Sequence, residues 1–279
     1  MNLQGTSQQA AVENSLRQAA AALQSGRAQD AERISKEVLS RNAKHPSASQ
    51  LLGMALLAQD RGADAVAPLR DAHRARANAA VETYLAAALR KTDRADEALA
   101  LLQQAITRQP PLPHAFYELG SLLYEQRRLN EAQEVLERGL AVAPQVAEFS
   151  VTLGNIFSDR GQSERAEAAF ARALTIMPGH PDALRGLGCS LMGRGHFAGA
   201  AERFTQALGR NPNDARTQLL LATCLFELGK TDEAIERLRA VVGTTPQLFG
   251  QAVKAMTEAG HGRLWLKPSA AAKFLGVKN

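Results

Sequence analysis

The sequence predicts an all-α protein built from repeated helical hairpins, and three observations support this fold class. A small residue recurs every 34 residues, at Ala98, Ala132, Ala166, Ala200 and Ala234. A proline follows each of these alanines twelve residues later, at Pro110, Pro144, Pro178, Pro212 and Pro246. Aromatic residues make up only 5% of the chain, which favours closely packed helices over an aromatic-rich β-sandwich or barrel.

The segment from residue 147 to residue 180 shows the repeat most clearly. Its first helical run carries Leu153 and Gly154 on an apolar face, and its second carries Phe170. Gly161 separates the two runs, and Pro178 ends the second because proline cannot donate the helical hydrogen bond. The segment therefore predicts two antiparallel helices joined by a tight turn.

Glycines recur at two places in the repeat, and each place has its own explanation. A glycine inside a helix costs about 0.5–1 kcal/mol against alanine, so the recurrence of Gly154 and its equivalents indicates close packing of the two helices. Gly161, Gly195 and Gly229 are expected to form the turns. Ser163 and Thr231 stand where the second helix begins, and we expect them to be N-caps.

The same pattern extends toward the start of the chain in a weaker form. Ala31 and Ala65 continue the series of small residues, but the step from Ala65 to Ala98 is 33 residues. We expect a loop near residues 77–78 to absorb this deletion, because loops tolerate changes in length. The first 11 residues are polar and are expected to be a flexible N-terminus.

The end of the chain departs from the repeat. Residues 249–279 are expected to form a capping helix and a tail, with a short tail helix that begins at Pro268 and stops at Gly276. In one interpretation Trp265, Phe274 and Leu275 fold back over the last hydrophobic face. In the other, the tail is a docking peptide, which leaves self-association through it open.

These residues resemble the tetratricopeptide repeat family, whose 34-residue helix–turn–helix carries a Leu-Gly pair, a later alanine and a closing proline. The Leu-Gly pair stands at Leu52–Gly53, Leu119–Gly120, Leu153–Gly154 and Leu187–Gly188, and it weakens to Leu85–Ala86 and Leu221–Ala222. The resemblance implies a right-handed superhelical solenoid of about seven repeats, because no hairpin can bury its own apolar face alone. We expect the repeats at 12–45, 46–78, 79–112, 113–146, 147–180, 181–214 and 215–248.

The chain lacks the motifs of the common catalytic and metal sites. None of its six histidines pairs with another at helical spacing, and there is no phosphate-binding GK[ST] loop. Cys189 and Cys224 are too few for a disulfide framework or a zinc site. We therefore predict a protein that is not an enzyme, with no catalytic residues, no metal and no cofactor.

Charge and hydropathy narrow the range of partners. The formal net charge is +5, but Lys and Arg are scattered among Asp and Glu without a basic run, so nucleic-acid binding is not favoured. No apolar run approaches the roughly 18–20 residues of a membrane span. The start of the chain has no secretory signal pattern. We expect a cytoplasmic protein that does not bind membranes.

The resemblance also implies where a ligand would bind, because the first helix of each repeat lines the concave surface in this family. Tyr and Arg suit anchoring contacts, and Asn can hold a peptide backbone with its donor and its acceptor. The residues expected to line this groove are His114, Tyr117, Tyr124, Asn155, Asp159, Arg185, Arg216 and Phe226. The carboxylate clamp of chaperone-binding relatives is not expected, because Val151, Gly186 and Leu220 occupy three of its five places.

The predicted function is a non-catalytic protein-interaction scaffold or adaptor. It would bind a peptide, or a helix of a partner protein, in the concave groove. The alternative is an accessory subunit that regulates a partner transferase or presents substrate to it. The sequence does not identify the partner.

Overall fold

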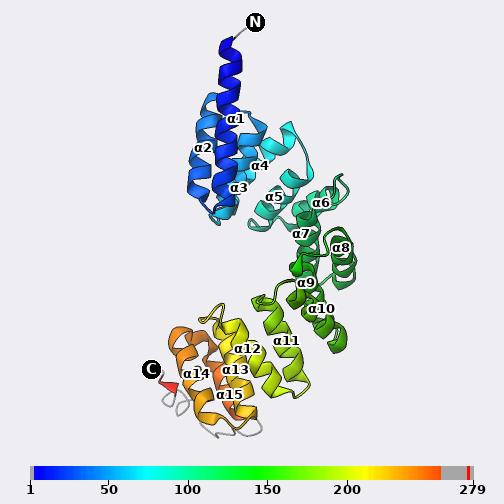
Figure 1. The fold of residues 1–279 in the computed structure, drawn as a ribbon, viewed down its shortest axis with the longest axis vertical. Helices are drawn as coiled ribbons and strands as arrows, with labels where there is room; N and C mark the ends of the chain where they lie inside the picture. The colour runs from blue at the N-terminus through cyan, green and yellow to red at the C-terminus, as the bar shows by residue number, and fades with distance from the viewer. Residues whose placement is uncertain (1–2, 259–274, 277–279) are drawn as a thin grey trace. The chain divides into compact units, whose positions relative to one another are not determined.

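The computed structural model describes residues 3–258, 275 and 276, and over these residues it is helical, with no strand. The chain divides into two compact parts (Figure 1). We call Met1–Ala143 the N-terminal half and Pro144–Asn279 the C-terminal half. The predicted all-α fold class is confirmed.

The N-terminal half contains four helical hairpins, each formed by an odd-numbered helix and the even-numbered helix that follows it. Within this half each hairpin packs on the next, as the hydrophobic pattern requires. The helices are α1 (Leu3–Gln24), α2 (Ala28–Arg41), α3 (Pro46–Ala58), α4 (Gly62–Ala75), α5 (Ala79–Arg90), α6 (Ala95–Ala105), α7 (Pro113–Glu125) and α8 (Leu129–Val142).

Over its described residues up to 258, the C-terminal half contains three hairpins of the same kind followed by one further helix. Its helices are α9 (Ala147–Asp159), α10 (Ser163–Ile176), α11 (Pro181–Gly193), α12 (Phe197–Leu208), α13 (Ala215–Glu227), α14 (Thr231–Thr244), the 3₁₀ turn η1 (Pro246–Leu248) and α15 (Phe249–Glu258). Helices α3, α5, α7, α9, α11 and α13 begin at the residues where the second to seventh repeats are expected to start.

The beginning of the chain differs from the expected flexible N-terminus. Helix α1 begins at Leu3, so residues 3–11 are helical. The segment contains alanine and glutamine, which are favourable helix formers, and it lacks proline, so nothing local stops the helix from extending outward. Its polarity is that of an exposed helix, with residues 8–11 exposed.

The recurring glycine of the first helix packs against the second helix of the same hairpin. A Cβ on Gly53 would lie 2.3 Å from Leu69 Cγ, and a Cβ on Gly154 would lie 2.5 Å from Phe170 Cε1. Such distances leave no room for a side chain. In the third hairpin, Ala86 takes the glycine position and is fully buried. The predicted close packing is confirmed.

A left-handed residue stands in the turn of each described hairpin. Gly161, Gly195 and Gly229 have φ values of 70°, 77° and 74°, as expected for turn glycines. In the N-terminal half the same position is held by Gly26 and by three non-glycine residues with positive φ, Asp60, Asp93 and Arg127. A non-glycine residue in this region carries about 1–2 kcal/mol of strain.

The expected N-caps Ser163 and Thr231 are wrong. Each is the first residue of its helix, and the residue before it caps without a side-chain hydrogen bond. Side-chain caps occur instead on several first helices. The Nδ1 of His180 accepts a hydrogen bond from the backbone N–H of Ala183, and Asn78 and Asp214 cap α5 and α13 through their side-chain oxygens.

Helix α15 closes the C-terminal half. Ala252 and Met256 are buried in the core cluster that also holds residues of α13 and α14. Leu275 is buried in the same cluster, which agrees with a tail that folds back over the last hydrophobic face. Gly276 has a φ of 76°, which suits the glycine that ends a helix. Trp265 and Phe274 lie outside the described residues.

Candidate protein-interaction surface

Two of the predicted groove residues come together on α7. The rings of His114 and Tyr117 stack with centroids 6.4 Å apart. The ring of Tyr84, from the neighbouring helix α5, lies 6.2 Å from His114. His114 is exposed and the two tyrosines are partly exposed, so this ring cluster presents aromatic surface to solvent.

A charged cluster continues from these rings along the same two helices. The Nε2 of His114 lies 3.7 Å from Glu118 Oε1. Arg90, from α5, contacts Glu118 Oε2 at 2.5 Å and Glu125 Oε1 at 2.6 Å. Arg90 and Glu118 are only 21% and 15% exposed, so this pair is fixed at the helix–helix contact. Rings and charges together form one strip across α5 and α7.

A groove of about 660 Å³ opens beside this strip. Apolar contact comes from Ala87, Ala95 and Leu122, and the remaining lining residues are polar or charged. They are Arg90, Lys91, Asp93, Glu118, Glu125 and Gln126. Tyr124, also predicted to line the surface, is half-buried on α7 but does not line this groove. The groove is therefore mostly polar, and its fixed charged groups could orient a ligand.

The predicted residues of the C-terminal half are more dispersed. Arg185 on α11 pairs with Asp182 at 2.6 Å and approaches Asp214 at 3.5 Å. Asn155 is half-buried on α9, whereas Asp159 and Arg216 are exposed. Arg185 therefore has carboxylate partners on its own helix and at the start of α13.

Asp214 combines a structural and an electrostatic role. Burial disfavours its charged form, but hydrogen bonds from Thr217 and the nearby Arg185 charge outweigh this, so the pKa of Asp214 lies below its ordinary value of 3.8. Its Oδ2 accepts a hydrogen bond of 2.5 Å from the Thr217 hydroxyl, and its Oδ1 accepts one from the backbone N–H of Arg216. The anion is suited to the helix N-terminus that it caps.

The prediction that Phe226 lines the groove is wrong. Its side chain is 0% exposed and belongs to the core cluster that contains Met256 and Ala252 of α15. The physical reason is the terminal helix. In this last hairpin α15 packs on α13 and covers a face that repeat spacing alone would leave open.

Sequence reasoning did not place Tyr84 and Glu118 among the site residues. Tyr84 contributes through a contact between helices of neighbouring repeats, which spacing within one repeat does not reveal. Glu118 stands four residues after His114, the spacing at which helical side chains meet, and that signal was available in the sequence.

The cysteines do not form a reactive centre. Burial raises the pKa of Cys224 to about 12, and burial also raises the pKa of Cys189 above its ordinary value of 9.0. Because the thiolate is the nucleophile, both groups are in the unreactive thiol form at neutral pH. Within the described residues there is also no cluster of His, Cys, Asp and Glu able to hold a metal ion.

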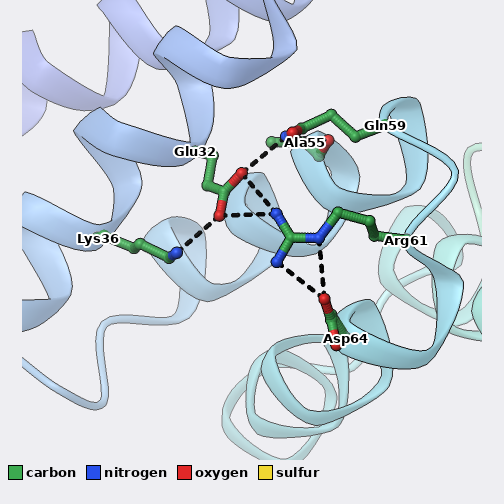
Figure 2. A network of polar contacts seen from close by, with 6 residues as sticks. All are labelled: Glu32, Lys36, Ala55, Gln59, Arg61 and Asp64. Carbon is green, nitrogen blue, oxygen red and sulfur yellow. Dashed lines mark hydrogen bonds and ion pairs between the residues drawn. The ribbon is translucent and has the colours of Figure 1, made fainter.

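Among the described residues, the carboxyl group with the largest pKa shift, Glu32, has a structural role. Hydrogen bonds from Lys36, Gln59 and Arg61 lower the pKa of Glu32 from 4.5 to about 2. Figure 2 shows this network, in which Arg61 also binds Asp64. It connects α2 to the end of α3 and the start of α4, so it fastens one hairpin to the next.

A second carboxylate is fully buried. Glu82 on α5 has a side chain that is 0% exposed, and its Oε1 lies 2.6 Å from Arg108 Nη2 and 3.7 Å from His73 Nε2. Buried charges require such partners. Because the partners come from α4 and from the segment after α6, this group also joins structural elements and does not open into a site.

None of the described helices combines the length and the apolar character that crossing a bilayer would require.

Helical hairpins that each pack on the next define the class of helical-repeat proteins. Family comparisons make the assignment specific. One tetratricopeptide repeat model matches residues 85–131 and 117–181, and another matches residues 191–258. These matches span more than half of the chain, and the chain belongs to the tetratricopeptide repeat family.

Solved structures share this fold at low identity. A chain of the APC/C hetero-tetramer Cut9–Hcn1 matches with a TM-score of 0.75 at 16% identity, over 87% of this chain and 48% of that chain, so this chain spans about half of its length. The pilF protein of Pseudomonas aeruginosa matches with a TM-score of 0.70 at 18% identity, over 78% of this chain and 99% of that one. No curated protein sequence matches the chain.

A third similar structure is YrrB, a tetratricopeptide repeat protein with an unusual peptide-binding site. It has a TM-score of 0.50 at 18% identity and covers 66% of this chain and 95% of its own. At this identity the likeness concerns the fold alone. Family membership makes the present chain a protein–protein interaction scaffold.

Proposed function

We propose that the chain binds a peptide, or a helix of a partner protein, on the surface formed by the first helices of its hairpins. The observation that carries the proposal is the strip across α5 and α7. Partly exposed rings of Tyr84, His114 and Tyr117 lie beside a groove of about 660 Å³. Three of its charged side chains, Arg90, Glu118 and Glu125, are already held by ion pairs.

Two physical arguments support this proposal. Exposed aromatic side chains give large contact areas at low entropic cost, and they are frequent anchors of protein interfaces. The Arg90–Glu118–Glu125 cluster is held in place before any ligand binds, which reduces the entropic cost of recognition. YrrB, which shares the fold, has a peptide-binding site of its own, so this kind of scaffold is compatible with peptide recognition.

In the C-terminal half, Asn155 and Arg185 are the proposed contact residues. Arg185 is 38% exposed in its ion pair with Asp182, so part of its guanidinium remains accessible to a ligand. An asparagine amide can accept from and donate to an extended peptide backbone. Each half presents its own set of contact residues, and each is therefore tested separately.

The test uses the full chain and a phage-displayed library of random peptides. Selected peptides are labelled, and their binding is measured by fluorescence anisotropy. For peptides bound by the N-terminal half, Tyr117→Ala is expected to weaken binding about tenfold or more, as loss of an interface anchor does. For those bound by the C-terminal half, the double variant Asn155→Ala/Arg185→Ala is expected to do the same.

The matched control replaces Glu134 and Arg172, which are exposed on the second helices α8 and α10, by alanine. This control should leave affinity unchanged. Selected peptides that bind all variants equally well would refute the proposed surface. Co-purification with a transferase would instead support the accessory role that the sequence left as an alternative.

A further inference from the structure

The groove between α5 and α7 carries unbalanced negative charge. Its two cations are already neutralised, because Arg90 is paired with Glu118 and Glu125, and Lys91 Nζ lies 2.7 Å from Asp60 Oδ1. Asp93 also lines the groove, is exposed, and has no hydrogen bond or ion pair to any described residue. The groove therefore has spare anionic groups and no spare cation.

Glu125 adds to this excess. Its side chain is 59% exposed, and Arg90 contacts its Oε1. A carboxylate has two oxygens with about four acceptor positions, so Glu125 keeps acceptor capacity on the solvent side. A ligand that donates hydrogen bonds and carries positive charge would use it without displacing Arg90.

The aromatic end of the strip favours the same kind of ligand for a different reason. Ring faces attract cations through their quadrupole, and this attraction is independent of carboxylate charge. His114 lies between the other two rings, 6.2 Å from Tyr84 and 6.4 Å from Tyr117, and beside the Glu118 carboxylate. Rings and spare carboxylates thus flank one groove.

We infer that the peptide bound by the N-terminal half carries a basic side chain, Lys or Arg, which docks in the α5–α7 groove against Asp93 and Glu125. This inference rests on the proposed peptide-binding function and specifies its ligand. The same charges disfavour acidic peptides and nucleic acids at this groove.

A basic segment of the chain itself is the competing occupant. Residues 251–279 carry five Lys or Arg residues and a single acidic residue, Glu258. However, Leu275 of this segment is buried in the core of the C-terminal half. We therefore take a separate peptide as the occupant, and self-association becomes an outcome of the test.

The experiment starts from peptides that the full chain selects and that Tyr117→Ala releases. Each Lys or Arg of such a peptide is changed in turn to Ala and to Glu. One basic position is expected to be required, with binding about tenfold weaker for Ala and weaker still for Glu. The double variant Asp93→Asn/Glu125→Gln should weaken the parent peptide about tenfold and reduce the salt dependence of binding.

The control Glu134→Gln/Glu164→Gln removes two exposed carboxylates from α8 and α10 and should change affinity by less than about twofold. The charge-reversed variant Asp93→Lys/Glu125→Lys should bind the peptide that carries Glu at the required position more tightly than it binds the parent peptide. This exchange of preference would not follow from a loss of folding.

Each result decides a different question. If peptides depend on Tyr117 but tolerate loss of every basic residue, and Asp93→Asn/Glu125→Gln has no effect, the basic ligand is refuted while the proposed function stands. If no selected peptide depends on Tyr117 or on Asn155 and Arg185, the proposed function itself fails. If light scattering shows oligomers that Asp93→Asn/Glu125→Gln dissociates, the occupant is the chain's own basic segment, and the separate peptide is refuted.

Discussion

The two halves of the molecule stabilise the same hairpin in different ways. Ion pairs connect successive hairpins in both halves, as in Glu32–Arg61 at 3.0 Å and Glu167–Arg194 at 2.9 Å, so the difference lies in the side chain that meets the recurring glycine. In the N-terminal half this side chain is a leucine, with Leu69 against Gly53 and Leu136 against Gly120. In the C-terminal half, two phenylalanines fill the space between helices. Phe170 lies against both Gly154 and Gly186, and Phe204 lies against Gly188.

The turns show the same division. Each hairpin of the C-terminal half uses glycine at the left-handed position, whereas the N-terminal half uses Asp60, Asp93 and Arg127 in three of its four turns. The backbone geometry is therefore shared, while its side-chain support is not. This difference teaches that the repeat requires a shape, which either leucine or phenylalanine can maintain between the helices and which either glycine or another left-handed residue can maintain in the turn.

The largest effect is expected at the contact between glycine and phenylalanine. Gly154→Ala would place a Cβ 2.5 Å from the Phe170 ring, and it should reduce the free energy of unfolding by about 1–3 kcal/mol. Urea denaturation followed by circular dichroism measures the change. If the loss is smaller than that of an ordinary surface substitution, the phenylalanine packing is not what distinguishes the C-terminal half.

A second substitution sharpens this test. In the third hairpin, Ala86 and Leu102 take the places of Gly154 and Phe170, and both are fully buried. Adding Phe170→Leu to Gly154→Ala should therefore cost less than the sum of the two single changes. Gly243→Ala is the control, because a Cβ there meets no atom within 4 Å and should be neutral or slightly stabilising.

An intermediate effect is expected in the charged network of the N-terminal half. Glu32→Gln should reduce stability at pH 7 by about 1 kcal/mol, because it removes the acceptor shared by Lys36, Gln59 and Arg61. Thermal unfolding of both proteins across a pH series measures this difference.

The direction of the pKa shift determines how the stabilising contribution of Glu32 changes with pH. The folded pKa of Glu32 is about 2, below its ordinary value of 4.5, so its contribution is fully present above about pH 4.5 and is lost as the pH falls toward 2. The difference between the parent and Glu32→Gln should shrink over that interval. Glu37→Gln, which removes an exposed pair on the same helix, should show a smaller difference at every pH.

The smallest effects are expected in the turns, and they have opposite signs. Gly161→Ala should cost about 1 kcal/mol, because alanine is strained at a φ of 70°. Asp93→Gly should gain about 0.5 kcal/mol by relieving similar strain at a φ of 55°, less the entropy that glycine loses. Equal shifts in the denaturation midpoint for both variants would show that turn strain does not distinguish the two halves.

The fold was largely predictable because its signal repeats. The spacing of Ala166, Phe170 and Pro178 recurs in each later repeat, so errors at single positions did not change the result. The candidate site was less predictable. In the site, His114 and Tyr117 do come together. The helix caps were also less predictable than the repeat, because those expected at Ser163 and Thr231 do not form. A serine or threonine one residue inside the helix looks the same in sequence as a capping residue.

The sequence by itself determined the hairpin, its turn and its internal packing, because these depend on residues at fixed spacing along one repeat. Only the tertiary structure decided which surfaces remain open. Phe226 has the spacing of a groove residue, yet α15 buries it, whereas Tyr84 joins His114 from the neighbouring repeat. Exposure depends on what packs against a face in space, and the periodic pattern specifies the face but not what covers it.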